Sequence, residues 1–227
     1  GTMKDAGIKV IPVIPSVQHA LRVQAEGVDA VIASGSEAGG HVGGVATLAL
    51  VPQVVDAVDI PVLAAGGIGD GRGFLAMLAL GAVGVQLGTA LIATEEADVS
   101  DWYRNAILEM QATDTIVTTA LTGATVRCIA TPEIRAYEEA RLSGAPKQEL
   151  QRLRQITRQN HGHADRVGGA DSNERRQGAA GQVAGLITRV RPTAEIIEHM
   201  IQDAAALSNG LADLAQASAP GAERAAE

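Results

Sequence analysis

A histidine stands inside a glycine-rich segment, residues 35–44, whose sequence is GSEAGGHVGG. The segment follows an apolar run, residues 29–33, that is typical of a buried strand. An imidazole can accept or donate a proton near neutral pH, and barrel enzymes place catalytic groups at the carboxyl ends of strands. His41 is therefore a candidate catalytic residue, and the alternative is an exposed loop histidine without a role. Glu37 either holds this loop through a backbone N–H or is solvated.

Two further glycine-rich turns follow apolar runs. PVLAAGG ends in Gly66 and Gly67, and VGVQL is followed by Gly88 and Thr89. Glycine lets backbone N–H groups approach a ligand closely, and the N-terminus of a following helix adds a positive dipole end. We predict a phosphate site of a mononucleotide or a sugar phosphate, with ordinary tight turns as the alternative.

Other nucleotide-binding and metal-binding patterns are weak. Residues 67–72 have arginine where the third glycine of a dinucleotide fingerprint would stand, and there is no Gly-Lys-Ser/Thr phosphate loop. His161 and His163 form an H-x-H pair, which we interpret as part of a solvated loop, and no metal site is predicted. Cys128 is expected to be structural, because no histidine lies in an obvious partner position.

Composition narrows the class of protein. The chain has 18 basic and 26 acidic residues and only 2% aromatic residues, which argues against binding to nucleic acid or to an acidic membrane surface. The single cysteine excludes an internal disulfide and favours a reducing, cytoplasmic location. The apolar window at residues 74–93 is interrupted by Gly81 and Gly84, so we expect a helix and a strand there and no membrane span. We also expect no secretory signal peptide.

Short apolar strands alternate with helices along the first half of the chain. Strands are predicted at residues 8–14, 29–34, 61–65, 83–87 and 114–121. Helices are predicted at residues 17–26, 46–58, 71–80, 101–110, 134–159 (interrupted at Ser143 and Gly144) and 193–214. Each crossover can hold a helix and no hairpin is predicted, so the strands should be parallel. The fold is a doubly wound α/β sheet or a (β/α)8 TIM barrel, for which five strands are too few.

The glycine-rich segment resembles the E-A-G-G-H-x-G motif of the FMN-dependent nitronate monooxygenase and FabK-type enoyl-[acyl-carrier-protein] reductase family, which is 2-nitropropane dioxygenase-like. Residues 61–67 resemble the phosphate-binding turn of that family, and residues 84–89 resemble the second half of the phosphate site. VIPVIPS, residues 10–16, and AGQVAGL, residues 180–186, are similar to the same family. The resemblance extends to about residue 205.

The resemblance implies a TIM barrel that binds FMN without a covalent bond. This chain is then expected to lack the first few βα units, which a longer chain or a second polypeptide would supply. Residues 1–125 would be the C-terminal part of the FMN-binding barrel and residues 126–192 a helical and loop insertion. Residues 193–215 would be a C-terminal helix completing the barrel, and residues 216–227 a tail.

The resemblance also assigns roles to site residues. His41 would be catalytic and lie above the flavin ring, Gln86 would lie near the flavin or its ribityl chain, and the glycine turns would hold the FMN phosphate. The complete set of predicted cofactor-binding residues is Glu37, Gly39, Gly40, Ala65, Gly66, Gly67, Gln86, Gly88 and Thr89.

Two activities follow from the resemblance. The main prediction is reduction of an enoyl thioester with NADH or NADPH through FMN, as in fatty acid biosynthesis, because residues 122–127 and the charged helices after them look like the reductase branch. The alternative is oxidation of alkyl nitronates with O2, in which the histidine assists activation of the substrate.

Two other classes of protein stay open. A sugar-phosphate lyase or isomerase would need a lysine or paired carboxylates at strand ends, and none is found in the expected places. A half-barrel remnant without catalytic activity would bind a partner. The helix at residues 193–214 either packs on the barrel or joins a homodimer.

Overall fold

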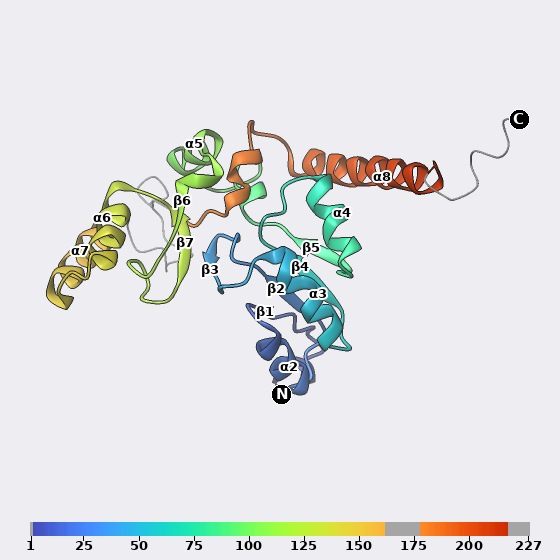
Figure 1. Cartoon of the computed structure of the whole chain (residues 1–227), viewed down its shortest axis with the longest axis horizontal. Helices are drawn as coiled ribbons and strands as arrows, with labels where there is room; N and C mark the ends of the chain where they lie inside the picture. Colours follow the sequence, from blue (N-terminus) through green and yellow to red (C-terminus); the bar gives the residue numbers. More distant parts are fainter. Residues whose placement is uncertain (1, 162–177, 218–227) are drawn as a thin grey trace, which may run out of the picture.

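A parallel sheet forms the centre of the computed structural model, which describes residues 2–161 and 178–217 (Figure 1). Its strands lie in the order β1 (Val13–Ile14), β2 (Val31–Ser34), β4 (Val62–Ala65) and β5 (Gly84–Gln86). All three pairings are parallel. The carboxyl ends of the four strands therefore lie along one edge of the sheet, and the predicted glycine-rich segments follow three of them.

Three helices connect these strands: α2 (Val17–Ala25), α3 (Thr47–Ala57) and α4 (Gly71–Ala79). Ser16 caps α2 by accepting a hydrogen bond from the backbone N–H of His19, and Asp70 caps α4 in the same way. The apolar side chains of the strands and helices form one core in which Val31, Val51 and Val54 are completely buried. The predicted helices that correspond to α2, α3 and α4 are confirmed to within a few residues, as are the predicted strands that correspond to β2, β4 and β5.

The first predicted strand is too long. Residues 8–14 form a strand only at β1, and Ile8, Ile11 and Val13 are all exposed. Within the described residues β1 pairs on one side only, with β2, so its apolar side chains have little to pack against. The short helix α1 (Thr2–Asp5) precedes this segment.

The prediction of a fifth parallel strand is wrong. Residues 115–118 form β6 (Thr115–Thr118), which pairs antiparallel with β7 (Val126–Ile129), a strand that the sequence did not suggest. Gly123, with φ +91°, lies in the connection and supplies the left-handed conformation that a tight turn needs. β7 also pairs antiparallel with β3 (Gly40–His41), so the second sheet has the order β3-β7-β6.

Helices flank this hairpin. They are α5 (Asp101–Glu109), α6 (Pro132–Leu142) and α7 (Lys147–His161), and α6 and α7 are separated at Ser143 and Gly144 as predicted. The predicted loop beyond His161, including His163, lies outside the described residues. The proposed boundary between residues 125 and 126 stays a prediction, although it falls inside the β6–β7 hairpin.

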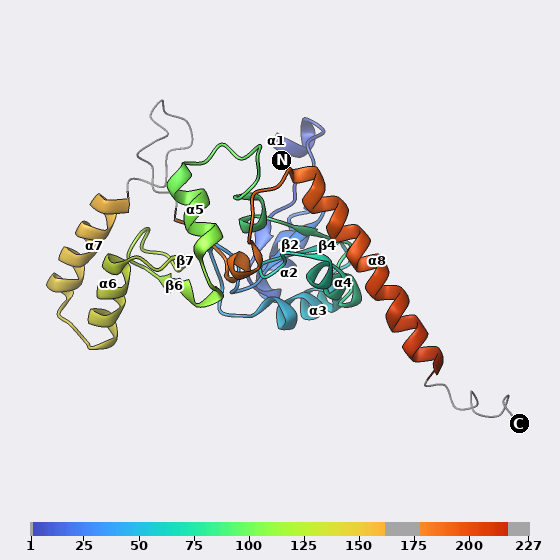
Figure 2. The same cartoon turned by 90° about the horizontal axis from the view of Figure 1, so that it is seen from above.

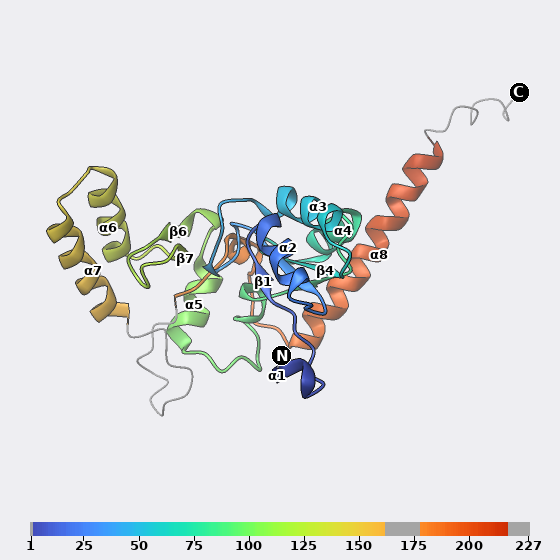
Figure 3. The same ribbon diagram turned by 90° about the horizontal axis from the view of Figure 1, so that it is seen from below.

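The last helix, α8 (Thr193–Ala217), packs against α4 (Figure 2). Its buried residues are Ile196, Met200 and Ala204. A Cβ on Gly71 of α4 would lie 2.5 Å from Cβ of Asp203 on α8, so the two helices approach closely at this glycine. The C-terminal part of α8 extends away from the body of the molecule (Figure 3). None of the described helices has the length and apolar character needed to cross a bilayer.

Candidate active site

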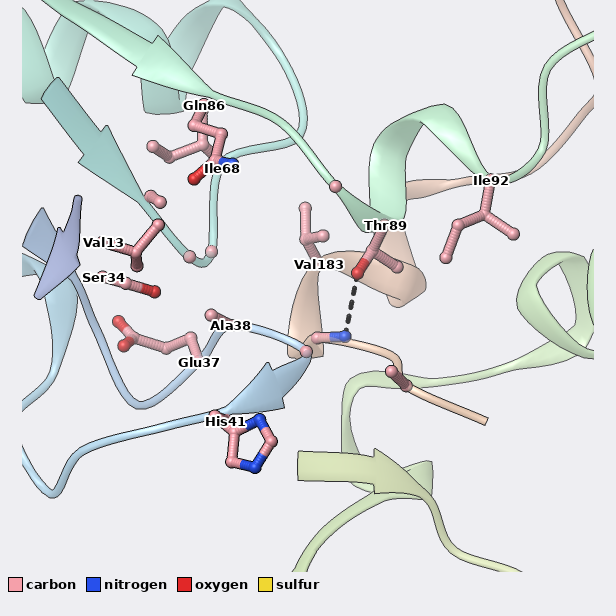
Figure 4. A pocket seen from close by; sticks show the side chains of 17 residues that line it. Val13, Ser34, Glu37, Ala38, His41, Ile68, Gln86, Thr89, Ile92 and Val183 are labelled. Carbon is pink, nitrogen blue, oxygen red and sulfur yellow. Dashed lines mark hydrogen bonds between the residues drawn. The ribbon is translucent and has the colours of Figure 1, made fainter. Parts of the chain in front are cut away.

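A pocket of about 400 Å³ lies at the carboxyl ends of the parallel strands (Figure 4). All the predicted site residues line it except Gly40. The other lining residues are Val13, Ser34, Ala38, Ile68, Ile92, Ala179, Gly181 and Val183. The topology therefore brings the three glycine-rich segments to one cavity, although their roles in binding a ligand stay predictions.

The turn after β4 has a left-handed backbone. Gly66 and Gly67 have φ values of +93° and +73°, a conformation that L side chains rarely adopt. None of the hydrogen bonds formed within the described residues uses the backbone N–H of either glycine. The second and third amides of the next helix are already used, because Asp70 accepts hydrogen bonds from the N–H groups of Arg72 and Gly73. The turn itself therefore offers the free donors.

The turn after β5 faces open space. No heavy atom lies within 4 Å of the position that a Cβ on Gly88 would take. Thr89 is buried, and its hydroxyl oxygen accepts a hydrogen bond of 2.9 Å from the backbone N–H of Gly181 (Figure 4). A ligand can therefore approach the backbone at Gly88, whereas the Thr89 side chain holds a neighbouring segment in place.

That neighbouring segment, residues 179–183, forms one wall of the pocket. None of its residues was among the predicted site residues. A Cβ on Gly181 would lie 2.6 Å from the carbonyl oxygen of Glu37, so the two segments touch through their backbones. The hydroxyl of Tyr103 on α5 donates to the carbonyl of Ala179, and burial raises the pKa of Tyr103. The two glycines of AGQVAGL were the sequence signal for this contact, because glycine often marks a position where another backbone approaches closely.

The carboxylate of Glu37 is bound to the start of α3. The backbone N–H of Thr47 donates to both of its oxygens, at 3.1 and 2.9 Å, and the Thr47 hydroxyl donates to Oε2 at 3.1 Å. Ala46, at the N-cap position, has no capping side chain, so Glu37 takes that place. The prediction that Glu37 holds the loop through a backbone N–H is confirmed, and the solvated alternative is wrong. Thr47 was not predicted.

His41 is held by strand pairing. It lies opposite Val126 in the β3–β7 pair, and the backbone N–H of Val42 donates to the carbonyl of Thr125. The residue is exposed and its imidazole borders the pocket (Figure 4). A loop histidine is thus given a defined backbone position while its ring remains accessible to a ligand.

The side chain of Arg127 on β7 links the loop that carries Ser36 and His41 to strand β6. Its Nε donates to the carbonyl of Ser36 at 2.8 Å, and its Nη1 lies 2.9 Å from the hydroxyl oxygen of Thr115. Burial lowers the pKa of the Arg127 guanidinium, and the nearby negative charge of Glu37 partly opposes that shift. Arg127 could not be assigned from sequence, because its partner at Ser36 is distant along the chain.

Cys128 is buried, and its thiol points to the carbonyl of Ile116. Burial raises its pKa to about 12. Since the thiolate is the reactive form, we expect native protein to resist a thiol reagent such as DTNB at about pH 8. The thiol should react fully once urea unfolds the chain. Rapid labelling of the native protein, at the rate seen in urea, would contradict the structural role. Within the described residues no three His, Cys, Asp or Glu side chains gather to hold a metal ion.

The family model of nitronate monooxygenases matches residues 2–203. The chain therefore belongs to the nitronate monooxygenase family. A probable nitronate monooxygenase from Staphylococcus aureus strain JH9 is 47% identical over 56% of this chain and 39% of its own length, and the strain Newman relative is 46% identical over the same shares.

Solved structures place the fold in the same group of enzymes. FabK from Thermotoga maritima matches with a TM-score of 0.81 and 38% identity, over 94% of this chain and 66% of FabK. Nitroalkane oxidase from Streptomyces ansochromogenes matches with a TM-score of 0.73 and 31% identity, over 92% of this chain and 61% of that enzyme. The predicted family and the α/β class are confirmed. The chain spans well under half of the curated relatives that it matches.

Proposed function

We propose that the whole protein is an FMN-dependent oxidoreductase that oxidises alkyl nitronates with O2. The observation that carries this proposal is the pocket that brings His41 and the Gly66–Gly67 turn together in a chain of the nitronate monooxygenase family. The names of the curated relatives favour this reaction over enoyl reduction, which the sequence alone led us to prefer.

The pocket fits FMN. Its volume lies within the range of cofactor sites, the free N–H groups of Gly66 and Gly67 suit a phosphate, and apolar side chains such as Ile68 and Val183 suit a ring system. The described lining residues include no lysine or arginine, so the backbone would carry phosphate binding. When bound, FMN would supply the redox chemistry between the substrate and O2.

His41 would act on the substrate at the open side of the pocket. Its imidazole can accept or donate a proton at a nitronate oxygen or carbon, since strand β3 holds it beside the cavity. Glu37 would not compete for this role, because its carboxylate is engaged by Thr47.

We further propose that the first few βα units of the barrel come from another part of a longer protein or from a second polypeptide. The partial coverage of the relatives supports this proposal. β1 also supports it, because Val13 is 53% exposed although it lines the pocket.

A second candidate is reduction of an enoyl thioester with NADH or NADPH. The similarity to FabK over 94% of this chain favours it. A sugar-phosphate lyase or isomerase gains no support, since Glu37 is the only acidic residue and no lysine stands among the described lining residues.

The absorption spectrum of the purified full-length protein tests these proposals. We expect flavin bands that bleach when an alkyl nitronate is added without oxygen and return when air is admitted. Bands that bleach only with NADH or NADPH and recover with an enoyl thioester would establish the second candidate. A colourless protein that also fails to bind added FMN would rule out both.

A further inference from the structure

Thr47, the first residue of α3, touches two parts of the site at once. Its hydroxyl oxygen lies 3.1 Å from Oε2 of Glu37 and 3.0 Å from the carbonyl oxygen of Gly66. It also lies 3.3 Å from the carbonyl oxygen of Ala65. The residue is only 2% exposed, so none of these contacts is in exchange with bulk water.

The backbone of both loops packs closely around Thr47. A Cβ on Gly35 would lie 2.1 Å from the Thr47 hydroxyl oxygen, and a Cβ on Gly66 would lie 3.1 Å from the same atom. Two glycines from different loops therefore meet one threonine side chain. A small shift of Thr47 would be transmitted to both loops, because close-packed interiors do not absorb displacements.

Thr47 also holds the charge of Glu37. A Cβ on Gly67 would lie 3.7 Å from Oε1 of Glu37, so a carboxylate stands beside the turn that would bind a phosphate. The N–H of Thr47 donates to both oxygens of that carboxylate at the positive end of α3, and the single hydroxyl hydrogen is shared between the carboxylate and the carbonyl of Gly66. The negative charge of Glu37 therefore points to the start of α3. The N–H groups of Gly66 and Gly67 remain available to a phosphate.

We propose that Thr47 is a positioning residue that fixes the Gly66–Gly67 turn relative to the loop carrying Glu37 and His41. This inference rests on the proposed function, since the turn is taken to hold the FMN phosphate. Through Thr47, the turn that is taken to anchor the cofactor and the carboxylate of Glu37 keep one mutual position. A phosphate-specific effect on binding follows from this geometry.

Thr47→Val and Thr47→Ser test the proposal, with Thr157→Val as a matched control. Valine keeps the shape and removes the hydroxyl, whereas serine keeps the hydroxyl. Thr157 is also buried, and its hydroxyl donates to the carbonyl of Leu153 within α7, away from the pocket. Dissociation constants for FMN and for riboflavin, which lacks the phosphate, are measured by flavin fluorescence. Amide hydrogen exchange is measured on the same proteins without flavin in two segments: residues 36–38, where the N–H groups of Ser36 and Ala38 are hydrogen-bonded, and residues 63–65, which lead into the Gly66–Gly67 turn.

For Thr47→Val we expect the FMN dissociation constant to rise about tenfold, as loss of one donor beside buried acceptor oxygens implies. The riboflavin constant should change less than about twofold. Hydrogen exchange should rise in both segments together, and Thr47→Ser and Thr157→Val should resemble the wild type. Equal weakening of FMN and riboflavin, or exchange that rises in one segment only, would overturn the proposal. A wild type that binds both flavins equally would instead refute the phosphate site, and the exchange data would still decide the role of Thr47.

Discussion

We expect Gly67→Asp to purify without bound flavin. The residue lies in the turn whose free N–H groups would hold the phosphate, and a carboxylate there would face a ligand of like charge. Two unit charges about 5 Å apart repel by roughly 3 kcal/mol at an effective dielectric constant of about 20, which corresponds to more than about a hundredfold loss of affinity. The ratio of absorbance at the flavin band to that of the protein measures the outcome.

Gly67→Asn is the matched control for this substitution. Any side chain at Gly67 is strained by its φ of +73°, but asparagine and aspartate tolerate this region better than most residues and have the same size. The space beside Gly67 also accepts a Cβ, whose nearest neighbour is Cβ of Glu37 at 3.5 Å. We expect the asparagine variant to keep part of its flavin. Equal flavin content in both variants would show that charge at this turn is irrelevant to the cofactor.

The sequence predicts this turn correctly because the signal is local. An apolar run followed by two glycines predicts a strand and then a tight turn, and the structure has β4 followed by a turn in which Gly66 and Gly67 are left-handed. The starts of the helices predicted at residues 17–26 and 71–80 are local as well, because Ser16 and Asp70 cap the helices that follow them. Parallel order then follows from the helical crossovers, so the meeting of three loops at one pocket can be predicted without coordinates.

The contacts that hold the site residues in position join residues far apart in the chain. Strand β3 has only two residues and exists because β7 pairs with it. Arg127 reaches Ser36, and Thr47 reaches Gly66, through the folded topology. The β6–β7 hairpin has a local signal, Gly123 between two β-branched runs, but residues 122–127 were interpreted only through their resemblance to the reductase branch.

The largest effect on turnover is expected for His41→Ala. The ring is exposed beside the pocket and β3 is held by its backbone, so removal of the side chain should leave the site otherwise intact. General acid–base groups typically contribute about 10²- to 10⁴-fold to a rate. We expect flavin content to be unchanged and kcat to fall at least about tenfold with an alkyl nitronate, or with an enoyl thioester if that is the substrate.

His199→Ala is the control for loss of a histidine elsewhere on the surface. His199 lies on α8, where its partner is Glu195, and it is not among the residues that line the pocket. Its removal should leave both flavin content and kcat unchanged. If His41→Ala turns over as fast as this control, the imidazole takes no part in the reaction. If it loses flavin as well as activity, His41 binds the cofactor, and the pocket has its substrate side elsewhere.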